Sequence, residues 1–196
     1  LAALCVPFLV GDGIIEEINP KFQIPITKQI PNSNFQIQNK FKNKLTGEEI
    51  SFDYIKKVVA LEQERLKKLS DIGEATRFFF ADKLEYEPEL LIWKKMSRED
   101  VENNLGQIHE LLKKIPVDSW TNDSIEEALL THIQAKGGKV GEYLWPMRAA
   151  LTGRKASPGP FDVAEVLGKE KSLKRIKTPM IAIPNFQGRD NSLNFM

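Results

Sequence analysis

The sequence predicts a mainly α fold made of helical hairpins, and three observations support this prediction. Apolar residues recur largely at three- and four-residue steps between residues 51 and 176, as they do on the buried face of a helix. Residues that cap or end helices separate these stretches. Outside residues 11–50, no convincing run alternates between apolar and polar side chains as a strand does.

The composition bounds the classes of protein to which the chain can belong. The 196 residues are 41% hydrophobic, so the length allows one ordinary domain or two small ones with a packed core. The net charge of +1 argues against a uniformly basic nucleic-acid coat but permits a local basic patch. One Cys and two His exclude a disulfide framework and argue against a metal centre. We therefore expect no metal site and no cofactor in this chain.

The two ends of the chain differ in composition. Residues 1–10 are nearly all apolar, with Pro7 among them. A helix that crosses a bilayer needs roughly 20 apolar residues, and a signal peptide needs a basic leading segment. We therefore expect residues 1–10 to form a helix that packs on the fold, with no membrane partner and a cytosolic location. Residues 178–196 lack a helical period, so we expect an irregular tail there.

Residues 11–50 are unlike the rest of the chain, with three prolines and many amides. A weak period-two pattern occurs within residues 22–26 and 35–37, which favours a long loop or a small β-hairpin over a helix. Two hypotheses remain open for this insertion: a solvated segment, or a basic arm that touches nucleic acid.

From residue 51 onward the pattern becomes helical. Ser51 is a candidate N-cap for a helix whose apolar stripe reaches Leu69. The aromatic run at residues 78–80 is typical of a core. Ser97 and Asp100 have the spacing of a capping box at the start of the next helix, which ends at Pro116.

Four shorter helices complete the prediction. They begin near residue 122 and at residues 141, 160 and 169, and Pro160 suits the first turn of its helix. The break at residues 116–118 divides the chain, so we expect subdomains at 1–116 and 117–177.

The usual catalytic constellations are missing from the sequence. It contains no glycine-rich phosphate loop, and neither His has a recognisable nucleophile partner. Residues 94–98 resemble the KMSKS signature of class I aminoacyl-tRNA synthetases, but the nucleotide-binding fold and HIGH-type motif that should precede it are absent. We therefore predict no catalytic residue, and we expect Ser97 to act as a helix cap.

Basic charge gathers toward the C-terminal end. Residues 139–177 hold nine basic side chains against four acidic ones, whereas residues 110–136 hold three against five. Such a cluster can dock phosphates or can be a solvated face without a partner.

The last third of the chain resembles the C-terminal end of bacterial glutamyl-tRNA synthetases. The resemblance rests on four segments in matching order and spacing: Leu144–Gly153, Ala156–Phe161, Leu167–Glu170 and Leu173–Ile176. It extends backwards to about residue 51. The resemblance implies an α-helical cage of two subdomains that holds the anticodon stem-loop of the tRNA for glutamate. It also implies that the catalytic domain, which uses ATP and magnesium to join glutamate to that tRNA, lies upstream in the full-length enzyme.

The resemblance also assigns site residues. Arg65 falls where family members specific for the glutamate tRNA read the third anticodon base, and a neutral Gln there relaxes the choice. Arg148, Ser157, Pro158 and Pro160 match positions around the first anticodon base.

Trp145 completes the predicted set, and it can belong to the core or can stack on an unstacked base. The alternative for the whole chain is a helical protein-interaction scaffold that does not bind RNA.

Overall fold

The computed structural model describes residues 1–18 and 40–182, and this part of the chain is mainly helical, as predicted. The helices are α1 (Ala2–Gly11), α2 (Phe52–Glu62), α3 (Ile72–Phe80), α4 (Arg98–Lys113), α5 (Asn122–Ala135), α6 (Val140–Thr152), α7 (Pro160–Leu167) and α8 (Lys169–Ala182). The strands are β1 (Ile15–Glu17), β2 (Lys40–Asn43) and β3 (Glu49–Ser51). The short 3₁₀ helices are η1 (Leu69–Asp71), η2 (Pro88–Leu91) and η3 (Val117–Ser119).

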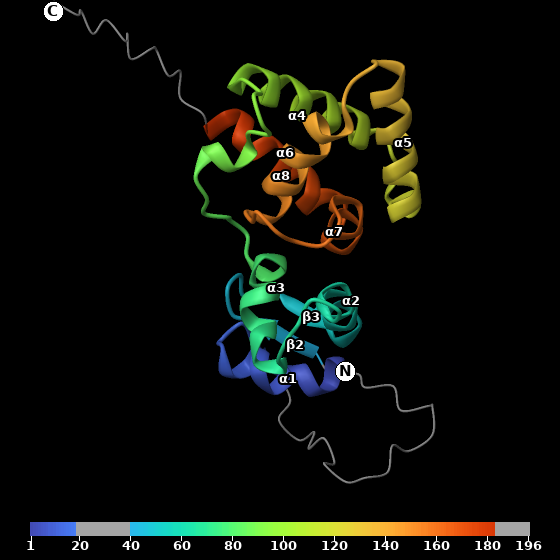
Figure 1. The fold of residues 1–196 in the computed structure, drawn as a ribbon. Helices are drawn as coiled ribbons and strands as arrows, with labels where there is room; N and C mark the ends of the chain where they lie inside the picture. Colours follow the sequence, from blue (N-terminus) through green and yellow to red (C-terminus); the bar gives the residue numbers. More distant parts are fainter. Residues whose placement is uncertain (19–39, 183–196) are drawn as a thin grey trace, which may run out of the picture.

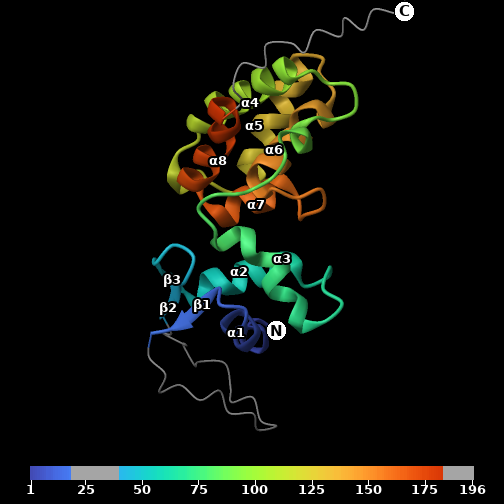
Figure 2. The ribbon, with the colours of Figure 1, turned by 90° about the vertical axis from the view of Figure 1, so that its left-hand side faces the viewer.

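The elements form two groups that meet at one end of α3. The first group comprises α1, the strands, α2 and α3, and the second comprises α4 to α8 (Figure 1). Figure 2 shows the C-terminal end of α3 directed at the second group, and α2 also packs on α7. The expected division into 1–116 and 117–177 stays a prediction about independent subdomains. In the packing itself, α4 contacts α5, α6 and α8, so the joint between the groups follows α3.

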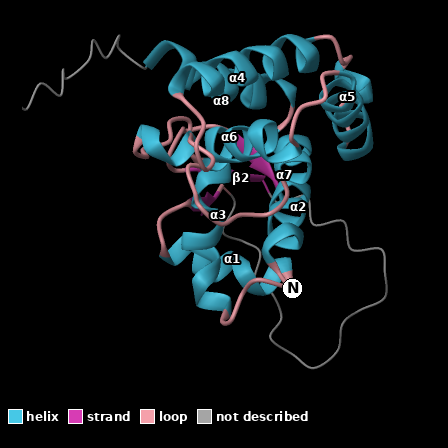
Figure 3. Cartoon of the chain, turned by 45° about the horizontal axis from the view of Figure 1, so that its top comes forward, coloured by secondary structure: helices cyan, strands magenta, loops and turns pink. Residues whose placement is uncertain are grey.

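The strands form a small antiparallel sheet in the order β1-β2-β3 (Figure 3). Ile15 pairs with Asn43, and Lys40 pairs with Ser51. The hairpin of β2 and β3 confirms the expected small β-hairpin near the N-terminus, because both strands lie within or at the edge of the predicted insertion. The period-two segments at 22–26 and 35–37, on which that expectation rested, lie outside the described residues.

The helix caps expected from the sequence are present in the structure. The Ser51 hydroxyl accepts a hydrogen bond from the Tyr54 N–H at 3.1 Å. Ser97 and Asp100 form the predicted capping box: the Ser97 Oγ accepts from the Asp100 N–H, and the Asp100 carboxylate accepts from the Ser97 N–H at 2.8 Å. Pro160 occupies the first turn of α7. These motifs involve neighbours in sequence, so their spacing alone predicts them.

Two helix ends differ from the prediction. The helix expected from Ser51 to Leu69 ends at Glu62, where the N–H groups of Arg65 and Leu66 both donate to the Glu62 carbonyl and form a turn. Four of the five residues after Glu62 are charged or polar, so the chain has no continuous apolar face to bury there. Conversely, α8 continues to Ala182, although a tail was expected from residue 178.

The core runs through both groups. The aromatic run at residues 78–80 is buried, with no side chain more than 5% exposed, which confirms its prediction as core. Within the described residues, no helix has the length and apolar character that a membrane crossing requires.

Candidate nucleic-acid interface

Two of the predicted base-reading residues come from different groups and lie near each other. Arg65 lies in the turn after α2, and Arg148 lies on α6. The pKa of the Arg148 guanidinium is below its ordinary value, first because burial disfavours its charge and second because the Arg65 cation is close. The structure therefore brings together two cations that the sequence separates widely.

Arg148 is held in a defined orientation. Its guanidinium carbon lies 4.5 Å from the centroid of the Trp145 ring, and its Nη2 donates to the Lys155 carbonyl at 3.0 Å. The Trp145 ring is fixed in turn, because its Nε1 donates to the Leu90 carbonyl at 2.8 Å. A guanidinium stacked on an aromatic face keeps its planar fork of donors pointed in one direction.

Trp145 packs within the fold, in line with the first of the two roles that the sequence left open, and its stacking on a base stays a prediction. It is half-buried on α6, anchored to η2 through Leu90 and covered by Arg148 on one face. Its packing supports the fold, and its stacked cation belongs to the candidate interface.

Arg65 is held by a carboxylate that the sequence analysis missed. Its Nε lies 3.3 Å from a carboxylate oxygen of Glu62, whose side chain is only 5% exposed, whereas that of Arg65 is 44% exposed. Burial raises the pKa of the Glu62 carboxyl, while the cations of Arg65 and Arg154 act in the opposite direction. The spacing of three residues between Glu62 and Arg65 was a visible signal for this pair.

The loop from α6 to α7 places the remaining predicted residues. Ser157 and Pro158 are buried, and the Ser157 hydroxyl donates to the Pro158 carbonyl at 3.1 Å. Pro160 is half-buried as the first residue of α7, which packs on α2. These three residues shape the loop beside Arg148, and the Ser157 hydroxyl is used within that loop.

Most of the basic surplus between residues 139 and 177 serves the fold. Six of its nine side chains are paired or donate hydrogen bonds within the chain: Lys139, Arg148, Arg154, Lys169, Lys171 and Arg175. Lys169, for example, donates to carbonyls at the C-terminal end of α4. The exposed lysines Lys155, Lys174 and Lys177 have no such contact within the described residues.

Comparison with known proteins identifies similar chains. Residues 3–179 match the family model described as "Anticodon binding domain". The chain is 39% identical over 124 residues to a glutamate–tRNA ligase of Clostridium botulinum strain Hall, which covers 62% of this chain and 25% of the relative. It is 36% identical over 132 residues to glutamate–tRNA ligase 2 of Thermoanaerobacter pseudethanolicus, which covers 67% of this chain and 27% of the relative. The chain thus spans about a quarter of the length of the curated relatives it matches.

Solved structures share the fold. A crystal structure of a glutamate tRNA ligase from Elizabethkingia meningosepticum CCUG26117, in complex with its amino acid, matches with a TM-score of 0.60 and 22% identity. That match covers 69% of this chain and 26% of the other. The glutamate–tRNA synthetase of Elizabethkingia anophelis matches with a TM-score of 0.53 at 23% identity, over 67% of this chain and 25% of the other.

Proposed function

The chain belongs to the anticodon-binding domain family, and from that premise we propose that it holds the anticodon stem-loop of the tRNA for glutamate. In this proposal it is the RNA-reading part of a glutamate–tRNA ligase. The observation that carries the proposal is the match of residues 3–179 to that family. The fixed orientation of the Arg148 guanidinium, stacked on Trp145 and bonded to the Lys155 carbonyl, supports it, because an oriented guanidinium fork suits the edge of a base.

The proposed contacts use the directional chemistry of arginine. A guanidinium fork can pair with two acceptors on one base edge, and each such pair contributes about 1–3 kcal/mol of discrimination against the wrong base. We assign Arg65 to the third anticodon base and Arg148 to the first, with the loop of Ser157, Pro158 and Pro160 beside it. Trp145 keeps Arg148 oriented, and a base can stack on the exposed face of the guanidinium or of the ring.

The ligase reaction itself belongs, in this proposal, to a catalytic domain upstream of these residues. That domain would use ATP and magnesium, in a cytosolic enzyme. In the described part of the chain, residues 94–98 come closest to a nucleotide-binding signature. They do not fit an ATP site, because Ser97 caps α4 and the Lys94 Nζ lies 4.2 Å from the centroid of the neighbouring Trp93 ring.

Binding of the 196-residue chain to a synthetic anticodon stem-loop tests this proposal. We expect binding that weakens as salt rises, because phosphate contacts release counterions, and that weakens further when the first or third anticodon base is changed. A helical scaffold without RNA binding would show neither effect. Binding with no dependence on the anticodon would contradict the assignment of the bases.

Arg65→Gln tests the specificity assignment. In charging assays with a full-length ligase that carries this chain, the variant should lose discrimination against the tRNA for glutamine, because a neutral amide cannot form the same forked, charged pair. Lys67→Gln is the matched control, since Lys67 is an exposed cation two residues further along. Equal discrimination in Arg65→Gln and the parent would refute the role of Arg65.

A further inference from the structure

Every carbonyl at the C-terminal end of α3 is capped by a side chain from elsewhere. Residues 78–81 would otherwise leave these acceptors without partners, as helix ends do. Within the described residues, their carbonyls accept from four side chains: Asn43 at 2.8 Å, Tyr54 at 3.0 Å, Lys171 at 3.1 Å, and Arg175 twice at 2.6 Å. We call this set the α3 cap.

The α3 cap joins the two groups of helices. Asn43 and Tyr54 belong to the first group, whereas Lys171 and Arg175 come from α8 in the second. Arg175 also donates through Nη1 to the carbonyl of Leu151 at 2.6 Å, near the end of α6. One side chain, 4% exposed, thus bonds the end of α3 and the end of α6.

A second contact fixes the same two helices. Arg154, which follows the glycine that ends α6, donates through Nη1 to the carbonyls of Glu74 and Ala75, both at 2.8 Å. These carbonyls lie one to two turns before the end of α3. The helix is therefore held at two levels by arginines from the second group.

The cationic part of the cap is costly to bury, which argues that it has a purpose beyond filling space. Burial lowers the pKa of Arg175 to about 10, although Tyr54, Asp82 and Tyr86 act in the opposite direction. Burial and the neighbouring Arg175 lower the pKa of Lys171 to about 8. An apolar contact would hold the two groups together, but it would not fix their spacing as several directed hydrogen bonds do.

The site depends on that spacing. Arg65 follows α2 in the first group and Arg148 lies on α6 in the second, so no local structure sets the distance between them. We propose that Arg175, assisted by Lys171, is a positioning residue that holds Arg65 and Arg148 at the spacing that reads the anticodon. This inference rests on the proposed function. It adds that Arg175 and Lys171 contribute to anticodon selectivity without contacting the RNA.

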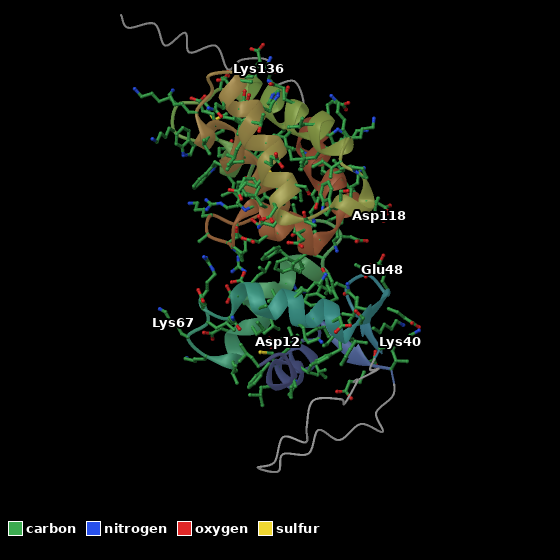
Figure 4. All side chains as sticks on the ribbon, turned by 90° about the vertical axis from the view of Figure 1, so that its right-hand side faces the viewer. Asp12, Lys40, Glu48, Lys67, Asp118 and Lys136 are labelled. Carbon is green, nitrogen blue, oxygen red and sulfur yellow. The ribbon has the colours of Figure 1, made fainter. Side chains whose placement is uncertain are left out.

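The spacing of the two groups can be measured without RNA. Lys67 and Lys136 lie in different groups (Figure 4) and are exposed, so each can be changed to Cys and spin-labelled, while the native Cys5 is fully buried. Pulsed spin resonance should give a narrow distance distribution in the parent and a broader one in Arg175→Met. Lys177→Met removes a charge from the same helix at an exposed position and should leave the distribution narrow.

Selectivity is measured in the same variants. The ratio of dissociation constants for the glutamate anticodon loop and a loop with one changed base should fall by about tenfold in Arg175→Met, which corresponds to the loss of one base contact. Arg175→Lys should recover part of the ratio. If Arg175→Met does not fold, Lys171→Met replaces it, because Tyr54 still caps the same carbonyl. Lys171→Met should broaden the distance distribution less than Arg175→Met does, and should lower the ratio of dissociation constants by less than tenfold.

The outcomes separate this inference from the proposed function. A broader distance distribution with an unchanged ratio would overturn the positioning role, as would an unchanged distribution in the variants that remove the cap. A parent chain that shows no anticodon preference at all would instead overturn the proposed function, whatever the distances show.

Discussion

Replacing Arg148 with alanine distinguishes a residue that reads a base from one that holds a phosphate. In the structure its guanidinium touches the Trp145 ring and the Lys155 carbonyl, and the Arg65 cation is close. Lys155 provides the comparison, because its side chain is exposed and only seven residues away. Arg148→Ala and Lys155→Ala each remove one positive charge from the same surface.

The contacts set the expected size of each effect. Loss of the stacking on Trp145 and of one hydrogen bond to an exposed carbonyl should each cost up to about 1 kcal/mol. Relief of the repulsion with Arg65 opposes these losses, so the net change in the free energy of unfolding should be small. Loss of a forked base contact should cost about 1–3 kcal/mol, or about 5- to 150-fold in affinity for the matched anticodon.

Salt dependence provides the assay that tells the two residues apart. Each contact to a single-stranded phosphate contributes about 0.7 to the slope of log affinity against log salt. Arg148→Ala should therefore lose affinity and first-base preference with an unchanged slope. Lys155→Ala should lower the slope by about 0.7 and keep the preference. A lower slope in Arg148→Ala with its base preference intact would refute the base-reading role.

Three further predictions follow from buried or capping groups. The pKa of Lys171 is about 8 in the folded chain against an ordinary 10.5, so the unfolded state binds more protons between these values and the free energy of unfolding should rise from pH 8 to pH 10. The rise should be on the order of 1 kcal/mol after allowance for solvent screening, and urea unfolding at pH 8, 9 and 10 measures it. If Lys171→Met shows an equally steep rise with pH, the titration of Lys171 is not its cause. Glu62→Gln removes the ion pair of Arg65 and should weaken third-base preference in competition binding, by lowering affinity for the matched loop while affinity for a loop with a changed third base stays the same. Unchanged preference would show that the ion pair does not orient Arg65. Ser97→Ala should destabilise the chain by about 1 kcal/mol, whereas Ser97→Gly should cost a few tenths, and equal thermal midpoints for Ser97→Ala and the parent would show that the cap is dispensable.

The sequence predicts the local motifs better than the contacts between distant segments. The capping box of Ser97 and Asp100 is visible because both partners lie within one helical turn. The bonds from Lys171 and Arg175 to the end of α3 cannot be predicted from the sequence. Their acceptors are backbone carbonyls, which every residue has, so no residue type marks the acceptor. The sequence shows the cations but not their acceptors. The resemblance to a known family named Arg65 and Arg148 as candidates, which stays a prediction, whereas Glu62 was missed because a carboxylate after an apolar stripe is usually solvated.

The use of basic residues within the fold predicts how RNA binding should respond to salt. A basic C-terminal third first indicates a surface that grips phosphates, but the structure leaves Lys155, Lys174 and Lys177 as its exposed cations without a contact in the described residues. If all three met phosphates, the slope of log affinity against log salt would be about −2. This segment should therefore contribute no more than about 2 to the slope, and a larger loss of slope when Lys155, Lys174 and Lys177 are neutralised together would contradict this account. Phosphate contacts carry no sequence information, so the preference for an anticodon must come from directed contacts to bases, which makes the spacing of Arg65 and Arg148 the decisive variable.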